Sequence, residues 1–430
     1  MRQIGIYGAS GQSGKAFFAD LLAMNVNVYG YARPSKHGQA EVDAVHRQGG
    51  IIREQPEGPD AVSSQLIPTR PDQYGHDLDR LAESSMIIFS HPSVYHEATA
   101  RELKPLLRAQ RQRVPLVLSP SRTMGTPYLW QILGRDYPVV AFQTCPYACK
   151  TFRPGAVFVK QRKRAWLASI EGDTPRYTIS TLKQLFPQIV MSRTAATTSL
   201  GNIGAVFHPA AYLLNLPAIE AARAAGRDFS FYMEGIAHNP EVGAVVGRID
   251  QTRLRIARAL GCSVFGLDED PREEEWSAIM ERVWRLSNTE GLDPRDKVKL
   301  TGRYLKPIHN SVVSAQHWLA YTYGVRRVRG ESLASAIGRT PNYQAKSFPQ
   351  ERYAHEDVPA GLVPLESLAR RLDIEHGDIS HAIDLYNEMA GVDARKTGRN
   401  LNGFSTEYLR WYLLDGNSRV RTNRWQRAAS

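Results

Sequence analysis

The chain has 430 residues, enough for two domains, and its 42% hydrophobic and 23% charged residues are typical of a soluble globular protein. No apolar run approaches the roughly 20 residues of a membrane span, three cysteines argue against a disulfide framework, and the sequence opens on a strand without a signal peptide's apolar region. We therefore expect a cytoplasmic protein. The net charge is +11, but the basic residues form no nucleic-acid-binding motif. The charge therefore favours anionic small molecules over nucleic acid or membrane as partners.

The first 195 residues alternate between strand and helix patterns. The strand "RQIGIYG" is followed by "SGKAFFADLLAMN", in which Phe17, Phe18, Leu21 and Leu22 share one helical face. Further strands are predicted at "VNVYGYA", "GGIIREQ", "SMIIFS", "VPLVLSP", "PVVAFQT" and "AWLASIEG". Strands separated by helix-length segments indicate βαβ units and a parallel sheet, so residues 1–195 are predicted to form a Rossmann dinucleotide-binding domain.

Helical patterns dominate from residue 196 onwards. They include "GAVFHPAAYLLNL", "TRLRIARALG", "WSAIMERVWRLSN" and "ISHAIDLYNEMAG", and several end at glycine, as helices often do. Residues 196–430 are therefore predicted to form a substrate-binding and catalytic domain. The expected fold class is α/β, with an N-terminal Rossmann domain and a mostly α-helical C-terminal domain.

A glycine-rich turn joins the first strand to the first helix. Gly8, Gly11 and Gly14 would provide a tight turn, close backbone approach to a pyrophosphate and close helix–strand packing. The N–H groups at the start of the helix would face the phosphates. The turn residues expected to contact the cofactor with these glycines are Ser10, Gln12 and Ser13.

The second strand ends in cations where such folds usually place an acid that binds a ribose hydroxyl. Arg33 lies 19 residues after Gly14, and Ser35 and Lys36 follow it. A carboxylate at this position would repel a 2′-phosphate, whereas an arginine can bind the phosphate through its planar fork and stack on adenine. The sequence therefore predicts NADPH as the cofactor, with NADH binding more weakly.

Three later stretches, residues 201–215, 231–261 and 351–369, are difficult to explain by packing alone. Five segments of the chain, in and around these stretches, carry a resemblance to a known family. They are "LSPSRTMGTPYLWQIL", "AFQTCPYACKT", "VFHP", "RYAHEDVPAGLVP" and "TGRNLNGF". In their order and spacing they resemble segments of the opine dehydrogenases, the octopine dehydrogenase-like family, over nearly the whole chain. The first departs from the family's Pro-Gly-Arg-Thr-Gly-Gly segment at Ser121 and Met124.

The resemblance implies a reaction and assigns roles to residues. An α-keto acid condenses with the amine of an amino acid, and NAD(P)H reduces the resulting imine to a secondary amine with two carboxylated arms. His208 would be the general acid/base, Asp357 would hold its other imidazole nitrogen, and Arg352 would bind a substrate carboxylate. Asn202, six residues before His208, is a candidate helper.

Within the family, the Arg33–Lys36 pair and the departures from the plainer pattern favour the opine metallophore subgroup of staphylopine, pseudopaline and yersinopine dehydrogenases, and among these a pseudopaline-type enzyme. Such enzymes join a nicotianamine-like, histidine-derived amine to pyruvate or 2-oxoglutarate. Tyr147 and His238 are candidates to contact this substrate. No metal site is expected in the enzyme, because the product is the chelator. A homodimer is a further expectation.

Three alternatives remain open from the sequence. One is an ordinary opine dehydrogenase that acts on a simple amino acid. Another is a related hydroxy-acid dehydrogenase, which would need a catalytic lysine in the helical domain, although Lys297, Lys299 and Lys306 carry no matching motif. The last is an NADP(H)-sensing protein without catalysis, which would leave His208 and Asp357 without a use.

Overall fold

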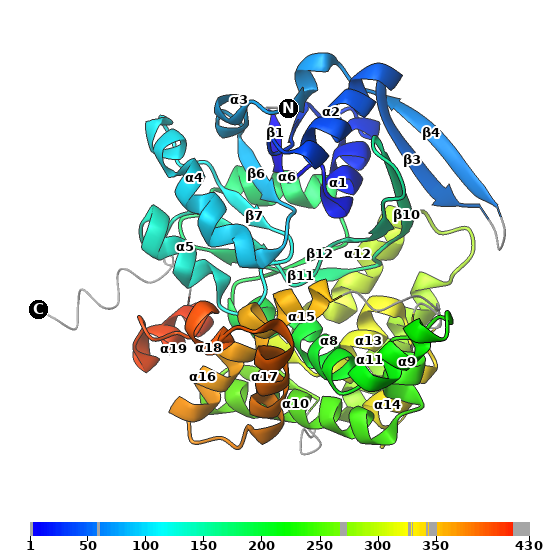
Figure 1. Ribbon diagram of the computed structural model, residues 1–430, viewed down its shortest axis with the longest axis vertical. Coiled ribbons are helices and arrows are strands. Elements are labelled where there is room, and N and C mark those ends of the chain that lie inside the picture. The colour runs from blue at the N-terminus through cyan, green and yellow to red at the C-terminus, as the bar shows by residue number, and fades with distance from the viewer. Residues whose placement is uncertain are drawn as a thin grey trace, which may run out of the picture. The chain divides into compact units, whose positions relative to one another are not determined.

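A computed structural model describes residues 3–57, 61–266, 273–325, 328, 330–340, 343 and 351–415. The chain forms two compact units (Figure 1). Within the described residues, unit 1 comprises residues 3–121 and 126–189, and unit 2 comprises residues 122–125 and those from 190 onwards. The division falls after residue 189, and the short segment Arg122–Gly125 groups with unit 2.

Unit 1 contains the main part of an eight-stranded sheet whose order is β12-β11-β8-β7-β6-β1-β2-β5, and the edge strand β12 begins at the last described residue of the unit. Its strands are β1 (Ile4–Tyr7), β2 (Val28–Tyr31), β5 (Tyr74–Gly75), β6 (Met86–Phe89), β7 (Leu116–Leu118), β8 (Val139–Phe142), β11 (Trp166–Glu171) and β12 (Ile189–Ser192). Strands β1, β2, β5, β6, β7 and β8 pair in parallel, whereas β11 runs antiparallel to β8. The parallel Rossmann-like sheet expected from the sequence is confirmed.

Helices connect these strands and pack on the sheet (Figure 1). They are α1 (Gln12–Ala23), α2 (Lys36–Gln48), α3 (Leu78–Ala82), α4 (His96–Ala109), α5 (Gly125–Leu133) and α6 (Arg176–Leu185), with short 3₁₀ turns η1 (Pro71–Gln73) and η2 (Ser93–Tyr95). Phe17, Phe18 and Leu21 of α1 are buried, as the predicted helical face requires. Burial of this face holds α1 against β1 and β2 and so fixes the glycine-rich turn between them.

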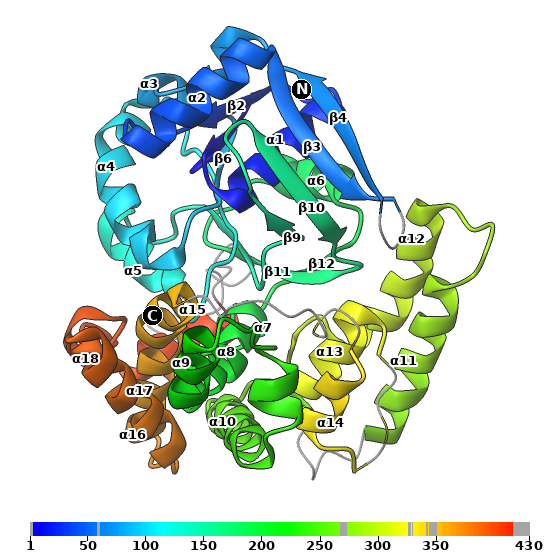
Figure 2. The same ribbon diagram turned by 45° about the vertical axis from the view of Figure 1, so that its right-hand side comes forward.

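A second, four-stranded sheet also belongs to unit 1 (Figure 2). Its order is β4-β3-β10-β9, formed by β3 (Gly50–Pro56), β4 (Val62–Pro68), β9 (Tyr147–Lys150) and β10 (Ala156–Arg162). The predicted strand "GGIIREQ" is therefore present, but it lies in this sheet rather than in the main one. Helix α1 packs against β3, β9 and β10, so it contacts both sheets of the unit.

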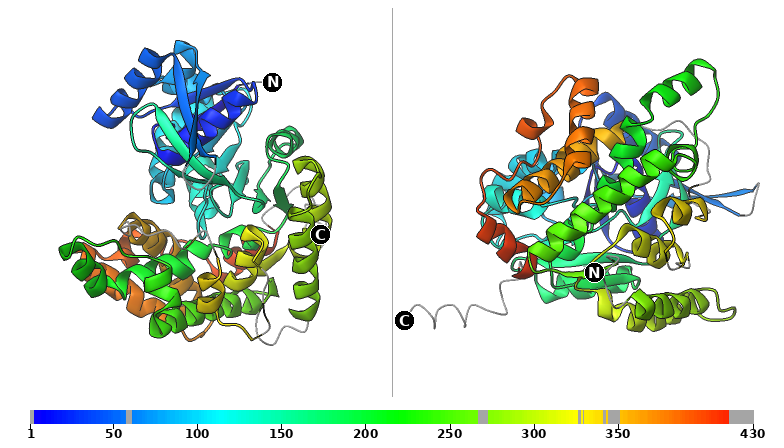
Figure 3. Two further views of the ribbon diagram at one scale, coloured as in Figure 1. Left: turned by 90° about the vertical axis from the view of Figure 1, so that its right-hand side faces the viewer. Right: turned by 90° about the horizontal axis from the view of Figure 1, so that it is seen from below.

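Unit 2 is mostly helical, as expected (Figure 3). Its α-helices are α7 (Ala196–Ser199), α8 (Ile203–Leu213), α9 (Leu216–Ala224), α10 (Pro240–Ala259), α11 (Glu273–Ser287), α12 (Pro294–Leu305), α13 (Ala315–Tyr323), α14 (Leu333–Gly338), α15 (Arg352–Asp357), α16 (Val363–Arg371), α17 (Gly377–Ala390), α18 (Ala394–Thr397) and α19 (Thr406–Asp415). The remaining elements are the π-helical turns η3 (Met233–Ala237) and η6 (Val358–Leu362), the 3₁₀ turn η4 (Lys306–Ile308), and a parallel strand pair, β13 (Ser263–Phe265) with β14 (Ser311–Val313). This strand pair was not predicted.

Helix α10 runs through the core of unit 2, where a buried ion pair fixes its neighbours. Arg253 is fully buried and donates to Asp250 and to the carbonyl oxygens of Leu200 and Val313. Helix α8 packs against α10, α15, α17 and η6. Helix α8 is therefore held on several sides, and it carries the histidine of the candidate active site.

Candidate active site

The glycine-rich turn of unit 1 has the geometry that a pyrophosphate site requires. Gly8 has φ +86°, a conformation that side chains other than glycine rarely adopt. A Cβ on Gly14 would lie 2.1 Å from the carbonyl oxygen of Gly8, so no side chain fits there. Gly11 caps α1 without a side-chain hydrogen bond and is exposed, which leaves the first N–H groups of the helix available to an anion.

Lys15, one turn into α1, does not serve this site. It is fully buried and forms a 2.6 Å ion pair with buried Glu41 of α2, whose other carboxylate oxygen accepts from the N–H of Gly155. Burial lowers the pKa of Lys15, and the hydrogen bond to Glu41 opposes this effect. The lysine therefore links α1 and α2 rather than contacting the cofactor.

The predicted 2′-phosphate segment follows β2. Arg33, Ser35 and Lys36 are all exposed. The Ser35 hydroxyl caps α2 by accepting from the N–H of Gly38. The start of this helix therefore lies beside the two cations, Arg33 and Lys36, in the chain. His37, which the sequence analysis did not select, lies with its Nε2 atom 3.2 Å from the carbonyl oxygen of Ser10 and connects this segment to the glycine-rich turn.

In unit 2, His208 and Asp357 come together from positions 149 residues apart. His208 lies on α8, and its Nδ1 atom is 2.6 Å from a carboxylate oxygen of Asp357, the last residue of α15. Asp357 is fully buried. Because an ionised carboxylate only accepts hydrogen bonds, this contact places a proton on Nδ1 and leaves the lone pair of a neutral imidazole on Nε2.

The Nε2 atom of His208 faces a tyrosine. It lies 3.0 Å from the hydroxyl of Tyr232, the residue before η3. Burial raises the pKa of Tyr232 well above its ordinary value, so the phenol stays protonated and donates to Nε2. Tyr353 stacks on the imidazole with ring centroids 4.4 Å apart, and Tyr343 lies 3.9 Å from the Tyr232 ring. These rings fix both partners of the hydrogen bond.

Arg122 forms the third part of the site. Its Nη1 atom lies 3.1 Å from the second carboxylate oxygen of Asp357 and donates to Asn202 at 3.2 Å. Its Nε and Nη2 atoms both donate to Glu356 at 3.2 Å. The guanidinium therefore orients the carboxylate of Asp357 and balances its buried charge.

Two glycines allow these groups to approach one another. A Cβ on Gly204 of α8 would lie 2.9 Å from an oxygen of Asp357 and 2.4 Å from Nη1 of Arg122. A Cβ on Gly361 of η6 would lie 2.6 Å from Cβ of Ala205. The "GLVP" turn therefore has a packing role, since it lets η6 and α8 meet beside the dyad.

The segment Arg122–Gly125 is anchored within unit 2 by its backbone. The N–H of Thr123 donates to the carbonyl oxygen of Ala360, and the N–H of Met124 donates to the Ser199 hydroxyl. Arg399 donates to the carbonyl oxygen of Thr123. Arg122 and Met124 have φ values of 58° and 56°, so the departure at Met124 places a side chain where glycine would be unstrained.

Comparison with known proteins agrees with this architecture. A family model described as the alpha-helical domain of NAD/NADP octopine/nopaline dehydrogenase matches residues 191–285 and 289–390. An opine dehydrogenase of Arthrobacter sp. (strain 1C) is 24% identical over 400 residues, which cover 91% of this chain and 92% of that protein. The chain is therefore similar to the opine dehydrogenases, over its helical part in the family model and over most of its length in this relative. It is an NAD(P)H-dependent oxidoreductase that acts on the CH–NH group.

Solved structures of two opine dehydrogenases share the fold of this chain. Octopine dehydrogenase with NADH and L-arginine is similar with a TM-score of 0.63 and 17% identity, over 93% of both chains. The apo form of yersinopine dehydrogenase gives a TM-score of 0.57 and 15% identity, over 95% of this chain and 93% of that one. These similarities favour a dehydrogenase over a cofactor-sensing protein without catalysis.

Of the other residues predicted for the site, one joins it and three lie elsewhere. Asn202 joins the site: it accepts from Arg122 and donates to the Thr123 hydroxyl. Arg352 is exposed at the start of α15, with its guanidinium over the ring of Tyr353. Tyr147 belongs to unit 1, where it donates to Asp20. His238 is exposed, just after η3.

Sequence reasoning missed Arg122, Tyr232, Tyr353 and Glu356. Arg122 stands inside the quoted "SRTMG" stretch, and Tyr353 and Glu356 stand inside "RYAHED", so a signal was present but not used. Tyr232 carries no local signal, because its role depends on η3 turning beside α8. No group of residues suited to hold a metal ion, and no helix long and apolar enough to cross a membrane, occurs among the described residues.

Proposed function

We propose that the protein is an NADPH-dependent opine dehydrogenase that joins an α-keto acid, 2-oxoglutarate or pyruvate, to the amine of a nicotianamine-like, histidine-derived compound and so forms an opine metallophore. The observation that carries the chemistry is the arrangement around His208, with Asp357 on one ring nitrogen and Tyr232 on the other. The exposed cations Arg33 and Lys36 support the choice of NADPH. A homodimer in the cytoplasm remains part of this proposal.

The proposed reaction needs a group that first accepts a proton and later donates one. The amine must lose a proton before it attacks the keto carbon, and the resulting hydroxyl must gain one to leave as water. His208 can do both, because Asp357 keeps Nδ1 protonated and stabilises the imidazolium. Bound NADPH would then supply a hydride to the imine carbon.

Tyr232 gives His208 a route to the substrate. The phenol holds the hydrogen bond of Nε2, so a proton that leaves this nitrogen passes through the Tyr232 hydroxyl unless the tyrosine side chain moves. When Nε2 is protonated, the phenol oxygen accepts from it and the phenol proton becomes free to be donated to the substrate. The phenol therefore acts as a relay in the proposed mechanism.

Carboxylate binding is assigned to Arg352. Its exposed guanidinium lies above Tyr353, which stacks on His208, so a carboxylate held by Arg352 would be near the reacting atoms. Arg122 is not assigned this role, since its guanidinium already contacts Asp357, Asn202 and Glu356.

The metallophore assignment rests on the cofactor segment and on the fold relatives. The NADP⁺ complex of yersinopine dehydrogenase shares the fold at a TM-score of 0.54. Solved octopine dehydrogenase complexes contain NADH with L-arginine, agmatine or pyruvate, and they favour the second candidate, an ordinary opine dehydrogenase for a simple amino acid. The two candidates differ in the size of the amine and in the cofactor.

The test is NADPH oxidation, followed by absorbance, with a matrix of amines and keto acids. The amines are L-arginine, L-histidine and a nicotianamine-like histidine conjugate, and the keto acids are pyruvate, 2-oxoglutarate and oxaloacetate. Turnover only with the conjugate supports the proposal, whereas turnover with a simple amino acid replaces it by the second candidate. His208→Ala is expected to lower kcat by about 10²-fold or more while NADPH binding is retained; unchanged kcat would make His208 structural.

A further inference from the structure

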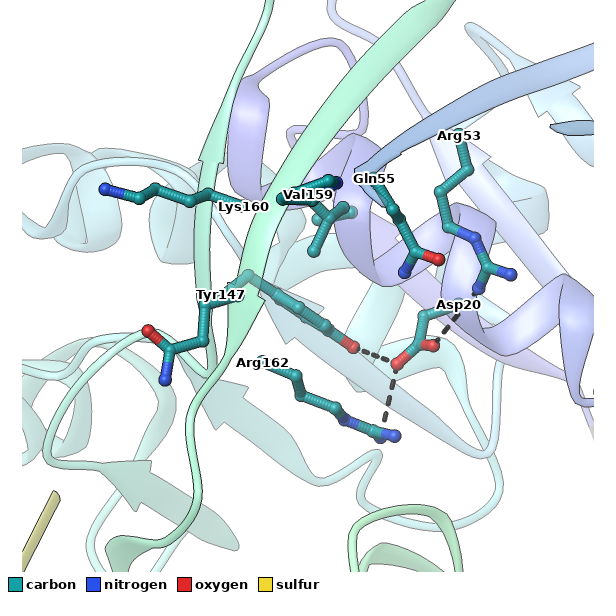
Figure 4. Close-up of a pocket in the computed structure, with 10 residues that line it drawn as sticks. Asp20, Arg53, Gln55, Tyr147, Val159, Lys160 and Arg162 are labelled. Atoms are coloured by element: carbon teal, nitrogen blue, oxygen red, sulfur yellow. Dashed lines mark hydrogen bonds and ion pairs between the residues drawn. The ribbon is translucent and has the colours of Figure 1, made fainter. Parts of the chain in front are cut away.

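A pocket of about 450 Å³ lies in unit 1, between α1 and the four-stranded sheet (Figure 4). Its polar lining comes from three directions: Asp20 on α1, Arg53 and Gln55 on β3, and Tyr147, Lys160 and Arg162 on β9 and β10. None of these side chains belongs to the cofactor site or to the His208 site of unit 2, and Tyr147, which the sequence suggested as a substrate contact, lies here instead. The pocket is therefore a feature that the proposed reaction does not explain.

Asp20 lies at the centre of the polar lining (Figure 4). Its carboxylate accepts from the Tyr147 hydroxyl at 2.6 Å and lies 3.2 Å from Nη2 of Arg162. Nη1 of Arg53 lies 3.7 Å from the other oxygen. The Asp20 side chain is only 14% exposed, so these contacts are partly shielded from water and from salt.

The lining carries more positive than negative charge. Arg53, Lys160 and Arg162 are three cations against the single carboxylate of Asp20, which gives a formal excess of two positive charges. Burial raises the pKa of Tyr147 well above its ordinary value, so this phenol adds no negative charge. The pocket therefore has an electrostatic preference for a ligand with two negative charges.

Arg162 adds a second observation. Its Nη2 atom donates to the carbonyl oxygen of Leu185 and lies near Asp20, and its guanidinium lies over the ring of Phe186. Its Nε atom, in contrast, is buried and has no hydrogen-bond partner among the described residues. A guanidinium N–H buried without an acceptor is unfavourable, and Nε gains an acceptor if the Arg162 side chain shifts toward an anion in the pocket.

We propose that this pocket binds a compact dianion, either a small dicarboxylate or a phosphate group. Arg53, Lys160 and Arg162 supply the charge, and the amide of Gln55 supplies a further donor. Val159, Pro56 and the Tyr147 ring offer apolar surface to the ligand's carbon atoms. The volume suits a small metabolite rather than a dinucleotide.

This site is separate from the cofactor phosphates. Asp20 lies eight residues beyond Gln12, the first residue of α1, which corresponds to about 12 Å along the helix axis. The pyrophosphate is expected at the beginning of that helix. An anion at Asp20 and a bound dinucleotide therefore occupy different positions on α1.

The test is calorimetric titration of the full chain with succinate and, separately, with inorganic phosphate. Both titrations are done at constant ionic strength in the presence of saturating NADP⁺, which blocks the nucleotide site. We expect saturable binding of at least one anion, and the two titrations identify which chemistry is preferred. Lys160→Glu is expected to raise the Kd for the anion by about 10-fold or more, because it reverses a charge in the lining.

Lys150→Glu is the matched control. Lys150 is exposed on β9 of the same sheet and does not line the pocket, so the same charge reversal should leave Kd unchanged. Arg53→Gln, which keeps a polar side chain, should weaken binding in the same direction as Lys160→Glu. Absence of saturable binding to the wild-type chain, or equal losses in Lys160→Glu and Lys150→Glu, would overturn the proposal. Turnover is not the readout, so neither outcome bears on the proposed reaction.

Discussion

His208 has a different partner on each ring nitrogen: Nδ1 lies 2.6 Å from the carboxylate of Asp357, and Nε2 lies 3.0 Å from the hydroxyl of Tyr232. The carboxylate determines which nitrogen carries the proton, and the phenol determines what the other nitrogen contacts. Asp357 thus orients the imidazole, whereas Tyr232 contacts the nitrogen that exchanges a proton. Each role can be tested by a substitution at that residue alone.

Asp357→Asn should lower kcat by about 10²-fold or more, because an amide can present its NH₂ group to Nδ1 and favour the wrong tautomer. NADPH binding should be retained, since the cofactor turn lies in unit 1. Steady-state kinetics and a cofactor titration measure the two effects. Asp378→Asn, which removes the carboxylate of an Arg248–Asp378 pair elsewhere in unit 2, should have near wild-type kcat. Similar kcat values for the two variants would contradict the orienting role.

Tyr232→Phe should lower kcat by about 10-fold or more with little change in KM, because it removes the phenol proton from the relay but keeps the ring packing. Tyr386→Phe is the control, since its hydroxyl also contacts a histidine, His355, at 3.1 Å. Solvent isotope effects on kcat should change for Tyr232→Phe alone. If kcat stays at the wild-type value, His208 contacts substrate directly and the tyrosine only packs.

Arg122→Met should shift the acid limb of the kcat/KM profile to higher pH. Without the guanidinium, His208 is the one ion-pair partner of the buried Asp357 carboxylate that remains among the described residues, so the imidazolium is stabilised. A general acid/base that must lose its proton then does so at higher pH. The measurement is kcat/KM as a function of pH at fixed ionic strength; an unshifted limb with reduced stability would indicate that Arg122 is purely structural.

Arg33→Ala should raise KM for NADPH much more than KM for NADH, because only NADPH carries the 2′-phosphate that the guanidinium would bind. Arg47→Ala provides a comparison, as it removes an equal charge from the last turn of α2, far along the helix from Lys36. Equal effects of Arg33→Ala on both cofactors would exclude the 2′-phosphate assignment.

Lys15→Met should destabilise unit 1 by about 3–5 kcal/mol, because it leaves the carboxylate of Glu41 buried without its lysine partner. The double variant Lys15→Met/Glu41→Gln removes both charges while keeping an acceptor for the N–H of Gly155. It should recover much of the lost stability. Urea unfolding followed by circular dichroism gives the comparison; a double variant as unstable as the single one would show that charge pairing is not the main contribution.

The sequence by itself determined the parallel sheet of unit 1 and the helical character of unit 2. Alternating apolar strands and helix-length segments are local patterns, and each is stabilised by burial of one face. The glycine-rich turn was also predictable, because its three glycines stand between a strand pattern and a helix pattern. The close approach of Gly14 to Gly8 explains why no larger side chain occurs there. The contact of His208 with Asp357 could be expected only through the family resemblance, since 149 residues separate the two.

Only the tertiary structure decided the surroundings of that pair. Arg122 reaches Asp357 because the backbone of the 122–125 segment is hydrogen-bonded to η6, α7 and Arg399, which are far away in sequence. Tyr232 meets Nε2 because η3 begins beside α8, and Asp20 meets Arg162 because β10 packs on α1. These contacts form between side chains that come together only when the core packs. The periodicity of the sequence indicates which face of a helix or strand is buried, but it does not indicate which distant residue that face contacts.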